Sequence, residues 1–550
     1  MCDVKKNRNE QPLRLKAICL AVLALGLHGA VMAQSVGTTD AAASEAAASD
    51  ADNAPRVDIN EYIVRGNSVL DARTIELAVT PYLGPKRTMK DVENARDALL
   101  SAYNARGYQS VYVDLPEQQV TGGVVYLQVN ETKVGRVRVV GAQYNSPLEV
   151  REQVPALQEG KVPDFNLAQA QLTTLNRSAK RQVMPLVKQG ALPGTMDVDL
   201  KVDDSSPWRA SAGLNNDYSA DTKELRATAS IGHDNLWQLG HSASLSFFGT
   251  PQDLNQTKVW SGSYTAPLRN SNWTLDASGY KSDSTVSTVG GTTVLGKGYA
   301  VGFKATYTVP NTGNWWHTMS VGVDFKNNEE ALQLGGSGDK VPLKYAPITL
   351  GYMGFVQNER SQYSIGLTML AGTRSLFGYG SDEKAFRYKR YEAKPNFMVL
   401  KADLNGSYNF ENDAQIGFRF AGQLTDSPLV SGEQIAAGGM NSVRGYLSAE
   451  TTGDYGVVGS LELRSKSLTY LNPWVENWRV YAFGDASRLK LRDPLIEQQD
   501  LFTLASVGIG TSFRLGEQVS GRVDVGYPLK SGPRTEKHDT RVNFSLNASY

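Results

Sequence analysis

From about Trp208 to Tyr550 the chain is a long succession of segments in which apolar and polar residues alternate. The pattern recurs at Ala243–Phe247 and Ala414–Phe420, and the final segment places apolar residues at Val542, Phe544, Leu546, Ala548 and Tyr550. Segments of about ten residues with this period are typical of transmembrane β-barrel strands, whose side chains face lipid and lumen in turn. At roughly 21 residues per strand and connection, the region predicts about sixteen strands, enough for a lumen wide enough to act as a channel.

The strands of a soluble β-sandwich or propeller would also show alternating apolar and polar residues. Here, however, the face opposite the apolar one is rich in Ser, Thr, Asn and Arg over some 340 residues, so a sandwich would lack its second apolar face. Aromatic residues stand near segment ends, where a barrel carries its interface girdles: Trp260, Tyr264, Trp273, Tyr280, Trp474 and Trp478. The pattern therefore favours a membrane barrel over residues 207–550.

Before the barrel, a mixed helical and strand pattern occurs twice, once in residues 56–131 and once in residues 132–206. Each copy predicts a small α+β domain of about 75 residues with the order β-α-α-β-β. In the first copy Asp91 is expected to cap the second helix and Gly107 to end it. The predicted elements of the first copy are Ile59–Val64, Thr74–Val79, Asp91–Ala105, Val111–Leu115 and Val124–Val129; those of the second are Val134–Val140, Pro147–Val154, a longer helix at about Asn166–Val187, and Met196–Val202.

The N-terminal residues have the features of an export signal. Residues 1–33 combine a basic stretch, an apolar core at Ala17–Leu27 and a cleavage site ending at Ala33, which predicts a signal peptide. Residues 34–55 then form an Ala/Ser/Asp-rich linker with no apolar face. Cys2 and Cys19 both fall in the signal peptide, so a mature chain without disulfides or thiolate chemistry is expected.

Composition argues against several function classes. The chain carries 56 basic and 56 acidic residues, which gives no reason to propose nucleic acid as a partner. The histidines are scattered, so no metal site is expected. Gly291–Gly298 nearly spells a phosphate-binding loop, but it lacks the final Ser or Thr and no helix is predicted after it. No catalytic constellation is evident either, and the expectation is a non-enzyme without cofactors.

One loop with glycines on both sides holds a lone arginine. It reads Gly438-Gly439-Met440-Asn441-Ser442-Val443-Arg444-Gly445-Tyr446, and about forty residues later Asp485 stands in a strand-like run. Alternation in that run places Tyr481, Phe483, Asp485 and Ser487 on one face. If the loop folds inside a barrel, Arg444 needs a carboxylate partner, because an unpaired buried charge is costly. A solvated surface arginine is the plainer alternative.

These features together resemble the two-partner secretion transporters of the ShlB/FhaC/HecB type, over nearly the whole mature chain. The order and context of several short motifs carry the resemblance. They are Arg65-Gly66-Asn67, Tyr103-Asn104-Ala105-Arg106-Gly107-Tyr108, Leu115-Pro116-Glu117-Gln118-Gln119, Leu175-Asn176-Arg177, Leu192-Pro193-Gly194-Thr195, Asp203-Asp204, Leu214-Asn215-Asn216, Tyr264-Thr265-Ala266-Pro267-Leu268, Val443-Arg444-Gly445-Tyr446 and Gly453-Asp454-Tyr455-Gly456.

The resemblance implies the roles of the domains and of the loop. The two small domains correspond to periplasmic POTRA domains, and the loop motif Val443, Arg444, Gly445 and Tyr446 folds back into the lumen. In that family the arginine pairs with the aspartate of a Phe-x-Asp-x-Gly strand, which here is Phe483, Asp485 and, in place of the glycine, Ser487. Only 22 residues lie between Gln34 and Pro55, which argues against the pore-plugging helix of many relatives.

The function implied is a pore in the Gram-negative outer membrane, surrounded by outer-membrane lipid. It would bind a large exported protein in extended form through the POTRA domains and pass it to the cell surface without nucleotide hydrolysis. Whether that partner is an adhesin, a haemolysin or a contact-dependent toxin stays open at this point. The alternative is an outer-membrane assembly factor of the BamA type, which shares the loop motif but usually carries more POTRA domains.

Overall fold

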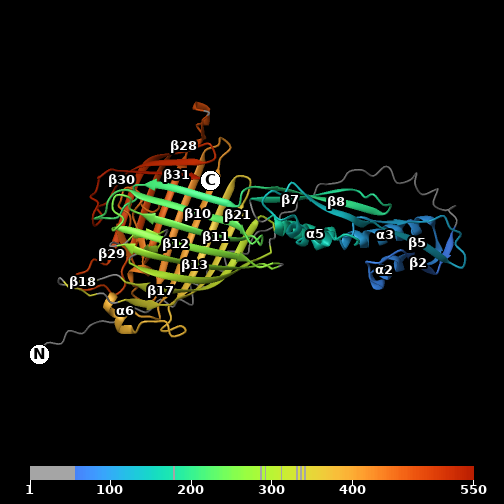
Figure 1. Cartoon of the computed structure of the whole chain (residues 1–550), viewed down its shortest axis with the longest axis horizontal. Coiled ribbons are helices and arrows are strands. Elements are labelled where there is room, and N and C mark those ends of the chain that lie inside the picture. The colour runs from blue at the N-terminus through green and yellow to red at the C-terminus, as the bar shows by residue number, and fades with distance from the viewer. Residues whose placement is uncertain are drawn as a thin grey trace, which may run out of the picture. The chain divides into compact units, whose positions relative to one another are not determined.

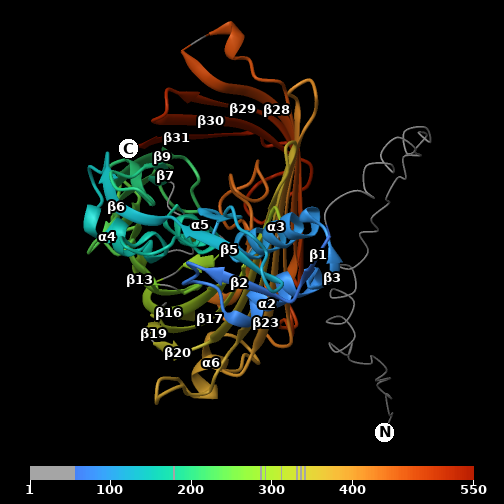
Figure 2. The same cartoon turned by 90° about the vertical axis from the view of Figure 1, so that its right-hand side faces the viewer.

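The computed structural model describes residues 56–176, 180–269, 271–284, 288–290, 293–295, 297–310, 313–329, 332–334, 337–339, 342–472 and 474–550 (Figures 1 and 2). The predicted signal peptide and linker, Arg177, and parts of the glycine-rich segments at 291–298 and 335–339 lie outside these residues. The described residues form two compact units, one that runs to Ala105 and includes Val111–Glu131, and one of Arg106–Ser110 with Thr132–Tyr550. Within the described residues, no helix has both the length and the apolar character needed to cross a membrane.

The first unit contains a three-stranded sheet, a two-stranded sheet of β1 and β3, and two helices. Strand β5 lies in the middle of the sheet, parallel to β2 and antiparallel to β4. Tyr103 of α3 is fully buried, and its hydroxyl donates to Asn67 Oδ1 at 2.6 Å, which joins two motifs that are far apart in sequence. The elements are β1 (Val57–Ile59), β2 (Glu61–Arg65), α2 (Ala72–Val79), β3 (Gly84–Arg87), α3 (Met89–Ala105), β4 (Val111–Asp114) and β5 (Val124–Glu131).

The start of α3 differs from the prediction. The helix begins at Met89, two residues before the expected cap. Asp91 lies in its first turn and accepts hydrogen bonds from the Thr88 amide and hydroxyl, both at 2.8 Å. Thr88 and Asp91 therefore bond reciprocally across the helix start, as in a capping box, and Asp91 is not the first capping residue. Gly107 follows the helix with a φ of +91°, a conformation that suits glycine.

The second repeat has the predicted order β-α-α-β-β, but its long helix is shorter than predicted. The helix expected at Asn166–Val187 ends at Leu175, and the chain continues as a strand from Arg181. The Asn176 backbone amide donates the last helical hydrogen bonds, and its side chain accepts from the Val183 amide at 2.7 Å and donates to the Val183 carbonyl at 3.0 Å. The elements are β6 (Lys133–Val140), α4 (Pro147–Glu152), α5 (Phe165–Leu175), β7 (Arg181–Gln189) and β8 (Thr195–Asp204).

Two aspartates on β8 fix this repeat. Hydrogen bonds from Arg138 and Lys188, at 2.8 and 2.6 Å, lower the pKa of Asp199 to about 2. Asp204 accepts from the backbone amides of residues 143–145, each at 2.9 Å. Asn145 in turn accepts from Asn235 at 3.0 Å, near the end of the barrel strand Arg226–Leu236. The second repeat is thus hydrogen-bonded directly to the barrel.

The rest of the chain closes into an antiparallel barrel in which sixteen strands can be followed through the described residues, as predicted (Figure 1). A short strand, β20, precedes β21 and pairs with the same neighbour. The strands are β9 (Trp208–Asn215), β10 (Arg226–Leu236), β11 (His241–Gly249), β12 (Thr257–Pro267), β13 (Trp273–Ser284), β16 (Gly298–Thr308), β17 (Trp315–Asn328), β20 (Leu343–Tyr345) with β21 (Ile348–Gln357), β22 (Ser361–Ala371), β23 (Met398–Asn409), β24 (Gln415–Thr425), β27 (Tyr455–Arg464), β28 (Val475–Lys490), β29 (Leu501–Leu515), β30 (Val519–Pro528) and β31 (Arg541–Ser549).

Alternation along the strands separates the two faces of the barrel. On β28, Tyr481, Phe483, Asp485 and Ser487 are buried inside, whereas the residues between them are exposed on the outer face. Because β9 leaves the second repeat directly, its first residue marks the near end of the barrel. Successive strands reverse direction, so β22 and β24 both finish at the far end. The long connections after these two strands therefore begin at the far end.

Candidate functional site

The connection from β24 to β27, residues 426–454, folds into the barrel. A two-stranded stalk forms its middle, with β25 (Ile435–Ala437) paired to β26 (Thr451–Gly453). We call residues 438–450, beyond the stalk, the tip, and residues 429–434, before it, the base. Gly438 and Gly439 turn the chain from stalk into tip with φ values of +107° and +102°, where a side chain would be strained.

Arg444 lies at the centre of the tip with a side chain that is 0% exposed. Its guanidinium forms a two-pronged pair with Asp485 of β28, from Nε to Oδ2 and from Nη2 to Oδ1, both at 2.7 Å. The backbone amide of Arg444 also donates to Asp485 Oδ2 at 3.0 Å. A fork-to-carboxylate pair of this geometry combines direction with charge, which a lysine could not reproduce.

Further groups on the barrel wall complete the environment of Arg444. Its Nη1 donates to Glu462 Oε1 of β27 at 2.6 Å, and its Nη2 donates to the Ser460 hydroxyl at 3.0 Å. Asp524 of β30 lies 3.7 Å from Nη1, and the Phe483 ring centroid lies 3.5 Å from the guanidinium carbon. One arginine thus ties the tip to three neighbouring parts of the wall.

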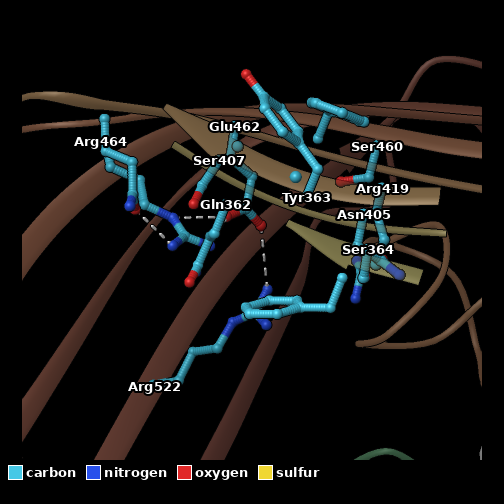
Figure 3. A pocket seen from close by; sticks show the side chains of 15 residues that line it. Gln362, Tyr363, Ser364, Asn405, Ser407, Arg419, Ser460, Glu462, Arg464 and Arg522 are labelled. Atoms are coloured by element: carbon cyan, nitrogen blue, oxygen red, sulfur yellow. Dashed lines mark hydrogen bonds and ion pairs between the residues drawn. The ribbon is translucent and has the colours of Figure 1, made fainter. Parts of the chain in front are cut away.

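The carboxylates around Arg444 are shared with two other arginines. Figure 3 shows Glu462 with Arg464 and Arg522 turned toward it; Arg464 Nη2 lies 2.6 Å and Arg522 Nη2 3.8 Å from the Glu462 carboxylate. Arg522 Nε lies 2.6 Å from Asp524. The cluster therefore alternates positive and negative groups, so that no charge in it lacks an opposite neighbour.

The residues next to Arg444 fit the tip against the wall. Val443 is fully buried, and the Tyr446 hydroxyl donates to the carbonyls of Ala505 and Lys530 at 2.9 and 2.7 Å. Gly445 has a φ of +93° and passes so close to β30 that a Cβ added at Gly526 would lie 2.6 Å from the Gly445 nitrogen. Both glycines are needed for this approach.

Ser487 stands where the resembling family has glycine. The side chain is buried, and within the described residues its hydroxyl has no hydrogen-bond partner. It faces the same interior as Asp485, two residues earlier on β28. A buried hydroxyl without a partner costs about 1–3 kcal/mol, so Ser487 is tolerated rather than used by the cluster.

The base of the loop is held at a second place on the wall. Glu433, 1% exposed, accepts from Lys326 of β17 at 2.7 Å and from the Tyr345 hydroxyl of β20 at 2.8 Å. Leu429 and Val430 pack in an apolar cluster with Phe386 of α6 (Glu383–Lys389) and with residues of the wall. In the closed order of strands, β17 is separated from β27 and β28 by several strands, so the base and the tip are fixed to different parts of the wall.

Three more acidic residues tie the loop to the far-end connections. Asp217, after β9, accepts from the Met440 amide at 3.0 Å. Glu450 accepts from the amides of Arg534 and Thr535 at 2.7 and 2.8 Å, in the connection between β30 and β31. Asp454 accepts from the Leu429 amide at 3.0 Å and from the Arg492 amide at 2.7 Å.

Two cavities lie in the barrel interior. One of about 1060 Å³ lies between the loop, at Ala436 and Ser442, and the wall formed by β13 to β27. A smaller one of about 340 Å³ is lined by Arg419, Glu462 and Arg464 (Figure 3). Within the described residues, no group of three or more His, Cys, Asp or Glu side chains is placed to hold a metal ion.

Sequence reasoning brought Arg444 and Asp485 together but missed several of their neighbours. Glu462, Asp524 and the whole base were not among the expected site residues. A signal for the first two was present, since Ser460, Glu462 and Arg464 alternate with leucines, and Arg522 and Asp524 occupy one face of their segment. Charged residues on the lumen face of a predicted barrel strand could therefore have been collected as candidate partners.

Two family models match the chain. "Haemolysin secretion/activation protein ShlB/FhaC/HecB" matches residues 194–513, and "POTRA domain, ShlB-type" matches residues 57–132. Among curated proteins, the outer membrane transporter CdiB of Dickeya dadantii (strain 3937) is 23% identical over 534 residues, covering 90% of this chain and 88% of the relative. The outer membrane transporter CdiB of Escherichia coli is 23% identical over 497 residues, covering 86% and 79%.

Solved structures show the same fold. CdiB from Escherichia coli superposes with a TM-score of 0.62 at 19% identity, covering 91% of this chain and 92% of that one. BamA from Haemophilus ducreyi lacking POTRA domains 1–3 gives a TM-score of 0.54 at 16% identity, covering 90% and 100%. The family model favours a secretion transporter over an assembly factor. The chain belongs to the ShlB/FhaC/HecB family of haemolysin secretion/activation proteins, outer-membrane transporters of two-partner secretion with periplasmic POTRA domains.

Proposed function

We propose that this transporter binds its exported partner protein in extended form on a POTRA sheet edge and passes it through the barrel to the cell surface. The Arg444 cluster serves this transport by fixing the loop tip in the lumen. The observation that carries the proposal is the wholly buried arginine that joins the loop to β27 and β28 inside a closed barrel. A buried ion pair of this kind stabilises the loop only while both charged partners are present, and removal of one partner costs about 3–5 kcal/mol.

Strand β7 supplies a suitable sheet edge. It pairs only with β8 in the described sheet, and Met184, Leu186 and Val187 are exposed although they are apolar. The Val183 amide donates to Asn176 and so points away from β8, and Pro185, two residues on, lacks an amide hydrogen. By the two-residue period of a strand, the Val187 amide also points outward, where an added strand could accept its hydrogen bond.

Transport in this proposal uses no nucleotide. The periplasm offers none, so the direction of movement comes from folding of the exported chain at the far end of the barrel. Main-chain hydrogen bonds to a sheet edge suit such a partner, because they recognise an extended backbone with little demand on its sequence. The partner is therefore expected to engage the edge strand before it folds.

Substitution at one position of β7 tests the sheet-edge step. Val187→Pro removes an outward amide and leaves the bonds to β8 in place, whereas Val187→Ala keeps the amide and removes only the side chain. We expect Val187→Pro to lower export of the partner protein at least fivefold, and Val187→Ala to leave it near normal. Equal export from both variants, at equal barrel abundance, would reject β7 as the docking edge.

Arg444→Ala tests the step inside the barrel. The expected result is a loss of export of tenfold or more, with the barrel still present in the outer membrane at its normal level. Heat-modifiable migration on gels reports whether the barrel is folded. Normal export by a folded Arg444→Ala transporter would show that transport does not depend on the cluster.

A further inference from the structure

The connection from β22 to β23 places a tight turn on the outer surface of the barrel. Leu376 and Tyr379 exchange two backbone hydrogen bonds, at 3.1 and 2.9 Å, around Phe377 and Gly378. The φ values of Phe377 and Gly378 are +52° and +78°, as in a type I′ turn. Asparagine or aspartate usually fills the first of these positions, and a large aromatic residue is strained there by about 1–3 kcal/mol.

Phe377 combines this strain with an exposed fraction of 90%. An aromatic ring that is both strained and exposed stabilises nothing within the chain. Local strain at an exposed position is a reason to look for a function outside the fold. The surroundings of the turn indicate what that function is.

The turn is fixed rigidly to the outer face of the wall. The Tyr379 hydroxyl donates to the Lys326 carbonyl at 3.1 Å, and its ring meets the outward-facing Phe325 edge-on at 5.5 Å. On either side, the Thr373 hydroxyl donates to the Ala346 carbonyl at 2.7 Å and the Ser381 amide to the Lys344 carbonyl at 2.7 Å. The turn therefore forms a fixed projection from the outer face of the barrel, which we call the overhang.

Under this overhang lies an apolar groove of about 710 Å³, with Leu376 and Phe377 in its lining. Its floor consists of two adjacent rows of cross-strand partners on the lipid-facing side of the barrel. One row runs Ile348, Val323, Phe303, Ala277 and Tyr264, and the other contains Val321, Ala305, Leu275 and Ala266. The alanines make the floor shallow between larger side chains.

The groove lies at the depth of the bilayer hydrocarbon. Along β16, Phe303 and Ala305 fall between Tyr299 and Tyr307, and aromatic residues of this kind mark the two interfaces of a barrel. The row crosses five strands, which at about 4.8 Å per step makes roughly 19 Å. That length exceeds half of a hydrocarbon core of about 30 Å, enough for one acyl chain of one leaflet.

We propose that this groove binds one acyl chain of an outer-membrane lipid beneath the Leu376–Tyr379 turn. The established lipid-facing surface of the barrel continues directly into the groove, so hydrocarbon is the medium that reaches it. Phe377 covers the chain from above, which gives the strained and exposed ring a partner. A phospholipid and a lipid A both carry such chains, and the shared ligand chemistry is a saturated hydrocarbon tail.

Native mass spectrometry of the full-length transporter, released from nanodiscs into detergent, measures the bound lipid. One preparation contains phosphatidylethanolamine with phosphatidylglycerol, and a second adds purified lipid A, so the mass of the retained molecule identifies its source. Ala305→Phe fills the floor of the groove, and Ala482→Phe makes the same change on the lipid face of β28, away from the groove. Phe377→Ser removes the cover without adding bulk.

We expect the unsubstituted protein and Ala482→Phe to retain one lipid molecule after the bulk lipid is removed. Ala305→Phe and Phe377→Ser should each lower the retained fraction at least tenfold. Heat-modifiable migration shows which variants are folded, and Phe377→Ser alone suffices if Ala305→Phe is not. Absence of a retained lipid in the unsubstituted protein, or equal retention by Phe377→Ser, would overturn the proposal.

Discussion

The tip and the base of the lumen loop are both buried in the barrel, but different interactions hold them. In the tip, one guanidinium bonds to Asp485 and Glu462 within 2.7 Å, and Val443 and Tyr446 pack beside it in an apolar cluster with wall residues. The base is attached by Leu429 and Val430 in a nine-residue apolar cluster, with the Glu433–Lys326 pair beside it. Both attachments therefore include apolar packing, but the tip adds a network of several buried charges, whereas the base adds a single ion pair.

This difference decides how each attachment fails. Apolar burial is spread over many atoms, at about 0.8 kcal/mol per buried methylene, and no single residue of the cluster carries it. A buried charge network depends on every partner, because removal of one leaves the others uncompensated. One substitution in the charge network should thus strongly loosen the tip, whereas the base should survive the loss of its ion pair.

Arg444→Ala is expected to have the largest effect. Loss of about 3–5 kcal/mol corresponds to a rise of two orders of magnitude or more in amide exchange over residues 438–450. Exchange over residues 429–434 should stay unchanged in the same hydrogen-exchange experiment. Arg360→Ala is a matched control, because the Arg360–Glu411 pair is largely exposed and should matter little. If the tip amides remained protected from exchange in Arg444→Ala, the tip would not depend on the charge network, and the two attachments would not differ.

Glu433→Gln should have a smaller effect, confined to the base. The Lys326 ammonium loses its carboxylate, and a charged hydrogen bond is worth about 1.5–3 kcal/mol. Leu429 and Val430 should nevertheless keep residues 429–434 in place, so their exchange rises only about tenfold to a hundredfold. Adding Lys326→Met should recover part of the loss by removing the unpaired charge. Complete exchange of the base in Glu433→Gln would show that charge, not packing, holds it.

Tyr446→Phe should weaken the tip by about 1 kcal/mol, because it removes one hydroxyl and leaves the ring in place. The hydroxyl donates to the carbonyls of Ala505 and Lys530, neither of which belongs to the charge cluster. Exchange of the tip amides should therefore rise about fivefold. An effect as large as that of Arg444→Ala would mean that the tyrosine, rather than the arginine, fixes the tip.

Ser487→Ala is expected to change the least. Its hydroxyl lacks a partner within the described residues, so replacement by a methyl group should leave the barrel as heat-stable as before or raise its stability by up to about 1 kcal/mol. Ser460→Ala is the matched control, since that hydroxyl accepts from Arg444 at 3.0 Å and its loss should destabilise the tip. Destabilisation by Ser487→Ala equal to that of Ser460→Ala would assign Ser487 to the cluster.

The barrel strands were predictable because each has one lipid face and one polar face, and alternation such as that of residues 542–550 records this directly. Strand β7 was not, because as an exposed edge it buries only Val183. Val183, Leu186 and Val187 then happen to fall at helical spacing after the true helix α5, which led to one long predicted helix. A strand with no buried face lacks the signal by which strands are recognised.

For the site, the sequence supplied Arg444 and Asp485 but not the fold of the loop around them. Which strands stand beside β28 depends on barrel closure, so the contributions of Glu462 from β27 and Asp524 from β30 require the strand order. The attachment of the base was harder still to predict, because Glu433 and Lys326 are 107 residues apart in the sequence. Lumen-facing charges can be listed from alternation, but their pairing cannot.

A double-mutant cycle on export of the partner protein tests the central claim most directly, using Arg444→Ala, Asp485→Ala and the two together at equal barrel abundance. The two residues form one unit in the structure, so each single change should reduce export tenfold or more and the double change should be no worse than either. Normal export by the single variants, or losses that multiply in the double variant, would contradict the claim that this pair fixes the lumen loop for transport.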